Sequence, residues 1–180
     1  YRGAQIREAL GDGRRFDIPI QYSDEGEVPL ETGGGIQRAL PLLDSVFVVI
    51  NADVFTDYPR SALAMRLESL PADTLAHFVL VPNPPFPANG DFSLDAGRIG
   101  LAAQHRYTFS GISVQRALLY AACQPGRFPA APLWQAAALR GQVAGEVFHG
   151  RWSDVGTPER LAELETLLSA ETSIPSNSGA

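Results

Sequence analysis

The sequence of 180 residues contains no lysine, so all 14 of its basic residues are arginines. Together with 20 acidic residues they give a formal net charge of −6 at pH 7. A protein that binds the nucleic-acid backbone needs a basic face, and the charge therefore argues against a nucleic-acid partner. The missing lysine also means that any phosphate contacts within this chain must come from arginine, backbone N–H groups or a metal.

Cysteine and long hydrophobic runs are scarce as well. Cys123 is the only cysteine, and a single thiol cannot form an internal disulfide, which favours the reducing cytoplasm as the location. We interpret Cys123 as a core residue, because free cysteine packs like a small hydrophobic side chain. No apolar run reaches the roughly 20 residues of a membrane-spanning helix, so we expect no membrane partner.

The signatures of several enzyme classes are missing too. The sequence has no Gly-x-Ser-x-Gly elbow for acyl transfer, and it fits neither of the two best-known glycine-rich nucleotide loops. His77, His105 and His149 lie far apart and lack metal-ligand spacing, so we interpret them as structural or surface residues. Whatever chemistry the chain performs must come from other side chains.

The sequence does contain an alternation of apolar strands and helices. We expect strands at 18–22, 46–50, 76–81, 107–114 and 143–149, a hairpin within 91–99, and an extended proline-rich loop at 82–89. We expect helices at 1–10, 61–68, 115–122 and 133–140, a short one after Gly35, and one that begins at Thr157. This order predicts one α/β domain over residues 1–169, with a Rossmann-like, mostly parallel sheet, and a disordered tail at 170–180.

The last predicted helix has a strong start signal. Thr157 offers a hydroxyl N-cap, Pro158 suits the first helical position, and an acidic residue follows in the first turn. Its leucines recur at helical spacing, and we expect Leu161, Leu164 and Leu168 to point inward.

The most informative segment is the β-branched run Val46–Ile50, which ends in Asn51-Ala52-Asp53. In open α/β sheets, ligands bind in the crevice outside the carboxyl ends of the strands. A second aspartate, Asp154, follows much later, in Trp152–Thr157. If the two carboxylates converge there, they predict a Mg²⁺ site for a phosphate-bearing substrate. Either aspartate alone could equally well cap a turn.

Three further features are candidates with a structural alternative. Gly33-Gly34-Gly35 could let the backbone approach a nucleotide, or could form a flexible turn before a helix. Asn51 and Asp91 could hydrogen-bond to the hydroxyl groups of a sugar, or could be residues of solvated turns.

Four segments, in their order and spacing, resemble the sugar-1-phosphate nucleotidyltransferases, which have a GT-A-like fold. The segments are Leu30–Ile36, Asn51–Asp53, Thr108–Ile112 and Trp152–Leu161, and the resemblance covers the chain to about Ser169. Within the family, the bacterial uridylyltransferases that act on N-acetylmuramate α-1-phosphate are the most similar, because of Tyr1–Gly3, Leu10–Gly13 and Gly90–Phe92.

The resemblance implies a reaction and a set of roles. A nucleotidyl group, here from UTP, would pass to a sugar 1-phosphate with release of pyrophosphate, in cytoplasmic cell-wall recycling. The implied roles are Mg²⁺ binding and catalysis for Asp53 and Asp154, nucleotide binding for Glu31, Thr32, Gly33 and Gly34, and sugar binding for Asn51, Asp91, Ser110 and Gly111. Positioning and charge neutralisation would drive the reaction, so no protein nucleophile is required.

The sequence departs from the family pattern at two places. Ala52 stands where the family usually has glycine, which narrows the allowed backbone and predicts a shifted Asp53. The family's first strand, phosphate loop and lysine would precede Tyr1, so we expect this chain alone to be inactive. The alternatives are another sugar nucleotidyltransferase, such as a mannose-1-phosphate guanylyltransferase, or a non-catalytic module that binds a sugar or a nucleotide.

Overall fold

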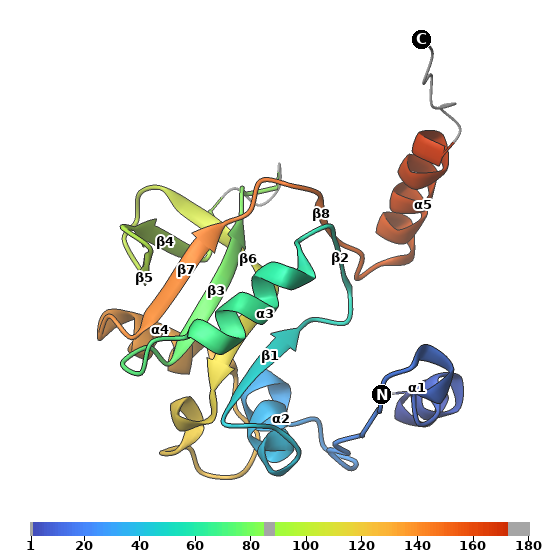
Figure 1. Ribbon diagram of the computed structural model, residues 1–180, viewed down its shortest axis with the longest axis horizontal. Helices are drawn as coiled ribbons and strands as arrows, with labels where there is room; N and C mark the ends of the chain where they lie inside the picture. The colour runs from blue at the N-terminus through green and yellow to red at the C-terminus, as the bar shows by residue number, and fades with distance from the viewer. Residues whose placement is uncertain (1, 85–88, 173–180) are drawn as a thin grey trace.

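The computed structural model describes residues 2–84 and 89–172, which form a mixed sheet with helices on both of its faces (Figure 1). The sheet contains β1 (Val46–Ile50), β3 (Ala76–Val81), β4 (Phe92–Asp95), β5 (Arg98–Gly100), β6 (Arg106–Arg116) and β7 (Val143–Val147), in the order β1-β6-β3-β7-β5-β4. A separate two-stranded sheet pairs β2 (Val54–Thr56) with β8 (Trp152–Asp154).

The helices of the described residues are mostly short. They are α1 (Gly3–Leu10), α2 (Glu31–Ala39), α3 (Arg60–Ser69), α4 (Ala130–Leu139) and α5 (Pro158–Thr172), with 3₁₀ turns at Arg14–Phe16, Leu40–Leu42 and Ala117–Tyr120. Both α1 and α5 stand away from the large sheet (Figure 1). Within the described residues, no helix combines the length and the apolar character of a membrane span.

The predicted α/β class is confirmed, but the prediction of a mostly parallel sheet is wrong. β6 runs antiparallel to both β1 and β3, and β3 and β7 form a parallel pair. The chain passes from β3 to β6 through the β4–β5 hairpin instead of a crossover helix, and strands joined without a crossover pair antiparallel. Since β1, β3 and β7 still share one direction, their carboxyl ends lie at one edge of the sheet, where a ligand-binding crevice is expected.

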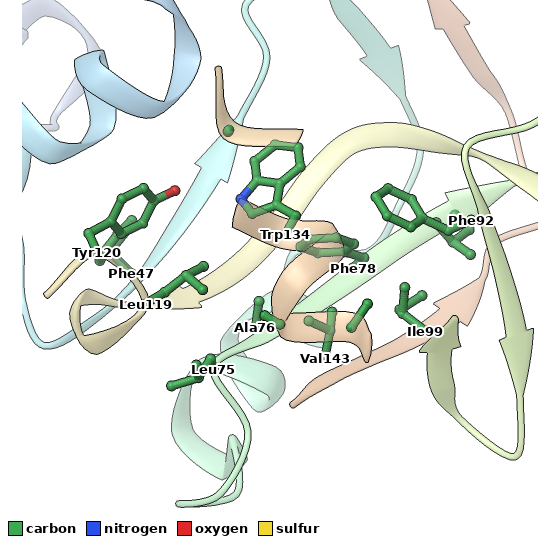
Figure 2. Close-up of a cluster of buried hydrophobic side chains, with 14 residues drawn as sticks. Phe47, Leu75, Ala76, Phe78, Phe92, Ile99, Leu119, Tyr120, Trp134 and Val143 are labelled. Carbon is green, nitrogen blue, oxygen red and sulfur yellow. The ribbon is translucent and has the colours of Figure 1, made fainter. Parts of the chain in front are cut away.

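The main core lies between the sheet and the helices α2 and α4 (Figure 2). Phe78, on the central strand β3, is fully buried. Its ring centroid lies 5.4 Å from Phe92, 5.0 Å from Phe109 and 5.2 Å from Trp134 of α4. The edge-on contact with Trp134 and the two tilted ring contacts fix α4 on the sheet.

The opposite face of the sheet has a smaller core under α3. Tyr58, Val79 and Ile112 are buried there, and Ala62 and Leu63 of α3 pack against them. The alternation along β3 explains the two cores, because Phe78 and Val79 are consecutive and must point to opposite faces. The helix predicted at 61–68 corresponds to α3.

Several predicted elements match the structure. Helices 1–10 and 133–140 correspond to α1 and α4, strands 46–50 and 76–81 to β1 and β3, and strands 107–114 and 143–149 to β6 and β7. The hairpin is present as β4 and β5, and its turn residues Ala96 and Gly97 have φ values of 45° and 77°. Two successive positive φ values are typical of the tight turn that suits the twist of a hairpin.

Two predicted elements are wrong. Residues 18–22 form no strand, and the segment predicted as helix 115–122 belongs to the end of β6 and the 3₁₀ turn that follows. Gln115 remains in the ladder because its buried amide has partners: Nε2 donates to Ser113 at 2.9 Å and Oε1 accepts from Tyr120 at 2.6 Å. A satisfied buried amide overrides the local helix preference of the alanines and leucines that follow.

The last helix begins as predicted, because the N–H of Arg160 donates to Oγ1 of Thr157 at 3.3 Å. Leu161 is 46% exposed, so the prediction that it points inward is wrong. Leu164 and Leu168 are half-buried. α5 continues to Thr172, past the predicted start of the tail, and residues 173–180 lie outside the described part of the chain. In the predicted loop at 82–89, residues 82–84 lack regular structure and 85–88 are not described.

Candidate active site

The small two-stranded sheet brings Asp53 and Asp154 together. Asp53 directly precedes β2, Asp154 ends β8, and Val54 is the partner of Asp154 in the antiparallel register. The pairing extends one step further, since the N–H of Val155 donates to the carbonyl oxygen of Asp53 at 2.8 Å. Two aspartates about a hundred positions apart in the chain thus become neighbours.

Gly156 lies between the two carboxylates. A Cβ atom at this position would lie 3.0 Å from Oδ1 of Asp154 and 3.3 Å from Oδ2 of Asp53. Because glycine has no side chain, the space between the two carboxylates stays clear for a ligand. Ala52, the departure from the family pattern, does not adopt a positive φ, so the alanine fits the turn before Asp53 without strain.

The donor set fits a divalent ion shared with a phosphate group. Carboxylate oxygens are the ligands that Mg²⁺ prefers, and this ion commonly takes one or two carboxylates plus substrate phosphates and water. Within the described residues, no group of three or more His, Cys, Asp or Glu side chains could hold a metal. Metal binding by Asp53 and Asp154 therefore stays a prediction, in which water or substrate phosphate oxygens would complete the coordination.

A cleft of about 800 Å³ opens beside Asp154. Its lining residues are Pro82, Pro84, Asn89, Gly90, Asp91, Thr108, Trp152, Ser153, Asp154, Arg160 and Glu163. The volume is within the range of small-molecule sites. Asp91 is held at the edge of β6: its N–H donates to Tyr107 at 2.7 Å and its Oδ2 accepts from the N–H of Phe109 at 2.8 Å. The cleft thus contains one predicted sugar-binding residue and one predicted metal ligand.

Asn51, Ser110 and Gly111 meet at a bulge in β6. Gly111 has a φ of 81°, and a Cβ there would lie 2.9 Å from the side chain of Asn51, so glycine is required for this close approach. Ser110 is buried, and its hydroxyl donates to Val79 at 2.7 Å and accepts from the N–H of Ile112 at 3.2 Å. The Ser110 hydroxyl therefore stabilises the bulge, and sugar binding by Ser110 and Gly111 stays a prediction. Asn51 is exposed beside the bulge, and hydrogen bonding of its side chain to a sugar stays a prediction.

The residues predicted to bind the nucleotide, Glu31, Thr32, Gly33 and Gly34, form the first turn of α2. They are not among the residues that line the cleft. A Cβ on Gly33 would lie 2.5 Å from the Phe128 ring, and one on Gly34 would lie 2.1 Å from the carbonyl oxygen of Gly126. These glycines let segment 126–128 pack closely on the helix. The carboxylate of Glu31 pairs with Arg127 at 2.8 Å. In this structure they have a packing role, and nucleotide binding by them stays a prediction.

The comparisons with known proteins decide the family. No family model matches the chain. The N-acetylmuramate alpha-1-phosphate uridylyltransferase of Neisseria meningitidis serogroup B is 39% identical over 175 residues, which cover 94% of this chain and 76% of that protein. The chain belongs to the sugar-1-phosphate nucleotidyltransferase family. It is therefore an enzyme of the nucleotidyltransferase class, and the alternative of a non-catalytic module is set aside.

Two further similarities agree with this family. The protein of the same name from Caulobacter vibrioides is 29% identical, with 91% of this chain and 70% of that protein covered. The inositol-1-phosphate CTP transferase from T. maritima has a TM-score of 0.69 at 16% identity, with 93% of this chain and 72% of that chain covered. This structural similarity to the T. maritima protein supports the nucleotidyltransferase fold with its mixed sheet.

Contacts between Asp57 and Arg151 hold together the two segments of the nucleotidyltransferase that contain Asp53 and Asp154. The sequence did not predict these contacts. Oδ1 of Asp57 accepts from the backbone N–H of Arg151 at 2.7 Å, and Oδ2 pairs with its Nε at 3.1 Å. The hydroxyl of Thr56 also donates to the carbonyl of Arg151 at 3.0 Å. Because these contacts lie at the ends of β2 and β8 farther from the aspartates, they keep both strands in register.

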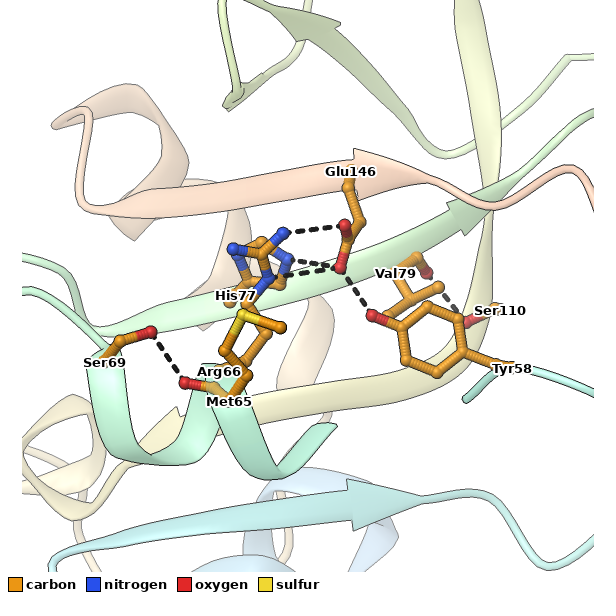
Figure 3. A network of polar contacts seen from close by, with 8 residues as sticks. All are labelled: Tyr58, Met65, Arg66, Ser69, His77, Val79, Ser110 and Glu146. Carbon is orange, nitrogen blue, oxygen red and sulfur yellow. Dashed lines mark hydrogen bonds and ion pairs between the residues drawn. The ribbon is translucent and has the colours of Figure 1, made fainter. Parts of the chain in front are cut away.

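A second polar network ties the segment after β2 to β7 of the large sheet (Figure 3). Glu146 accepts from the Tyr58 hydroxyl at 2.5 Å, from Nη2 of Arg66 at 2.9 Å, and contacts Nε2 of His77 at 3.1 Å. Burial alone would raise the pKa of Glu146, but the hydrogen bonds from Arg66 and Tyr58 and the proximity of His77 lower it to about 2. Burial lowers the pKa of His77, against the opposing effect of Glu146. The structure agrees with the structural interpretation of His77.

Both shifts predict that acid destabilises the fold. The folded pKa of His77 lies below its ordinary value of 6.5, so stability falls as pH drops through that value. The folded pKa of Glu146 lies below 4.5, so a second loss occurs between about 4.5 and 2. We expect Glu146→Gln to lower the free energy of unfolding at pH 7 by about 1–3 kcal/mol, because it weakens three contacts. Urea unfolding from pH 7 to pH 3 measures this, and an unchanged slope below pH 4.5 in Glu146→Gln would contradict it.

Proposed function

We propose that this enzyme transfers the uridylyl group of UTP to N-acetylmuramate α-1-phosphate and releases pyrophosphate. The family supports the reaction class, and the names of both relatives support the choice of base and sugar. The structural observation that carries the proposal is the pair Asp53 and Asp154, joined by β2 and β8 beside a cleft that also contains Asp91. A role in cell-wall recycling in the cytoplasm belongs to the same proposal.

In this mechanism a phosphate oxygen of the sugar 1-phosphate attacks the α-phosphorus of UTP, and pyrophosphate leaves. Asp53 and Asp154 would hold Mg²⁺, which when bound neutralises triphosphate charge and orients the phosphates. Asp91 would accept hydrogen bonds from sugar hydroxyl groups, and Glu31 to Gly34 would lie along the nucleoside. The chain's contribution is positioning and electrostatics, and no covalent intermediate with the protein forms.

Pyrophosphate release from UTP, GTP and dTTP, each combined with several sugar 1-phosphates, tests the specificity. The assay uses the purified protein with Mg²⁺ present. We expect kcat/KM with UTP and N-acetylmuramate α-1-phosphate to exceed every other pair by at least about tenfold, which corresponds to about 1.4 kcal/mol. No turnover with UTP would overturn the proposal, and turnover of GTP with mannose 1-phosphate would favour the guanylyltransferase alternative.

A further inference from the structure

Arg160 is a cleft residue with no role in the mechanism above. It lies in the first turn of α5, and its guanidinium Nη1 contacts Oδ2 of Asp154 at 2.9 Å. The two side chains are 51% and 44% exposed, so the ion pair is open to solvent and to the cleft. The other oxygen of Asp154, Oδ1, accepts from the N–H of Gly156 at 2.9 Å. Both oxygens of this predicted metal ligand are therefore already engaged.

The exposure of the pair makes it easy to exchange. A solvent-exposed ion pair stabilises by at most about 1 kcal/mol, so a divalent ion can displace the guanidinium from Asp154. The pair of Arg66 with Glu146 is different, because Tyr58 and His77 also contact that carboxylate. Arg160 thus neutralises the Asp154 carboxylate with a positive charge that a metal ion can replace.

The released guanidinium would remain at the cleft, where a phosphate group needs a cation. Among the described residues that line the cleft, the charged side chains are Asp91, Asp154, Glu163 and Arg160, so Arg160 supplies the positive charge. The chain has no lysine, and the planar guanidinium group matches the geometry of phosphate oxygens.

We propose that Arg160 binds the phosphate of the sugar 1-phosphate and that, without metal, it pairs with Asp154 instead. Metal binding at Asp154 then releases Arg160 for the substrate, so the two ligands bind with positive coupling. The inference rests on the proposed function, because it needs both the metal site and a sugar 1-phosphate in the cleft.

Arg160→Gln tests the proposal through two changes of opposite sign. Mn²⁺ binding to the nucleotide-free protein, followed by electron paramagnetic resonance, should tighten by about threefold to fivefold because the competing charge is gone. The KM of the sugar 1-phosphate should rise by about 10-fold to 100-fold, the usual effect of losing a charged hydrogen-bond partner. Arg160→Lys should restore part of the lost affinity for the sugar 1-phosphate.

Arg140→Gln is the matched control, because it removes the same charge outside the cleft. The Nε of Arg140 donates to Gln142 at 2.7 Å at the end of α4, and both measured quantities should stay unchanged. Weaker Mn²⁺ binding in Arg160→Gln would mean that Arg160 only orients Asp154, and would overturn the proposal. An unchanged KM would overturn phosphate binding.

Failure of the proposed function gives a different result from failure of this inference. If Mn²⁺ binds the wild-type protein and Asp154→Asn with equal affinity, the metal assignment is wrong. If another base or sugar is preferred, the Arg160 test proceeds with that sugar 1-phosphate, because the phosphate group is common to all of them.

Discussion

Replacing Asp53 or Asp154 with asparagine should lower kcat/KM for nucleotidyl transfer by about 100-fold or more, while the fold remains. The amide has nearly the same shape as the carboxylate but lacks the charge that would hold Mg²⁺, and a metal's transition-state stabilisation amounts to several kcal/mol. Asp53 lies on an exposed turn before β2, and Asp154 is the half-buried last residue of β8. The ion pair of Asp154 with Arg160 is solvent-exposed. Loss of that pair should change stability by less than about 1 kcal/mol.

Pyrophosphate release over a series of Mg²⁺ concentrations, together with thermal unfolding, measures both parts of this prediction. Asp95→Asn is the control, since this exposed aspartate ends β4 at the hairpin turn and lies outside the cleft. Its kcat/KM should equal that of the wild type. Wild-type turnover at low Mg²⁺ in both Asp53→Asn and Asp154→Asn would show that the metal assignment is wrong.

Phe78→Ala should lower the free energy of unfolding by about 3–5 kcal/mol, the largest stability effect that we expect in this chain. Phe78 is fully buried on the central strand and contacts three other rings, so its removal leaves a cavity that the rigid sheet cannot close. Urea unfolding at pH 7 gives the value. Activity should fall with the folded fraction, because the residue does not line the cleft.

Leu139→Ala is the matched control for the core. Leu139 ends α4, the helix that also contains Trp134, but its side chain is 75% exposed. Its truncation should change stability by no more than about 0.5 kcal/mol. A loss below about 1 kcal/mol in Phe78→Ala would contradict the arrangement of Figure 2, because it would mean that the ring is not packed there.

Local sequence patterns predicted strands and helices correctly where residues adjacent in the sequence decide the conformation. The continuous apolar run of β3 and the N-cap at Thr157 are examples, and both are present in the structure. The prediction failed where distant residues decide. Gln115 stays in a strand because of Ser113 and Tyr120, and the face of α5 that contains Leu161 is exposed because the helix stands away from the sheet.

Some residues of the candidate site could be predicted from local sequence, and others could not. Asp53 and Asp91 could be proposed from their positions after predicted strands and turns, since strand ends present side chains to a crevice. Arg160, Asp57 and Glu146 could not, because an arginine or a carboxylate is most often a solvated surface residue. Only their partners in space, Asp154, Arg151 and Tyr58, distinguish them.

The sequence by itself determined the α/β class, the apolar strands and the two aspartates that are candidates for a metal, because periodicity, β-branching and caps act over a few residues. It also determined that the chain has no lysine to offer to a phosphate group. Only the tertiary structure decided the direction of β6, the packing role of Gly33 and Gly34, and the contact of Arg160 with Asp154. These features depend on residues that the fold brings together from distant parts of the chain, and no local pattern contains that information.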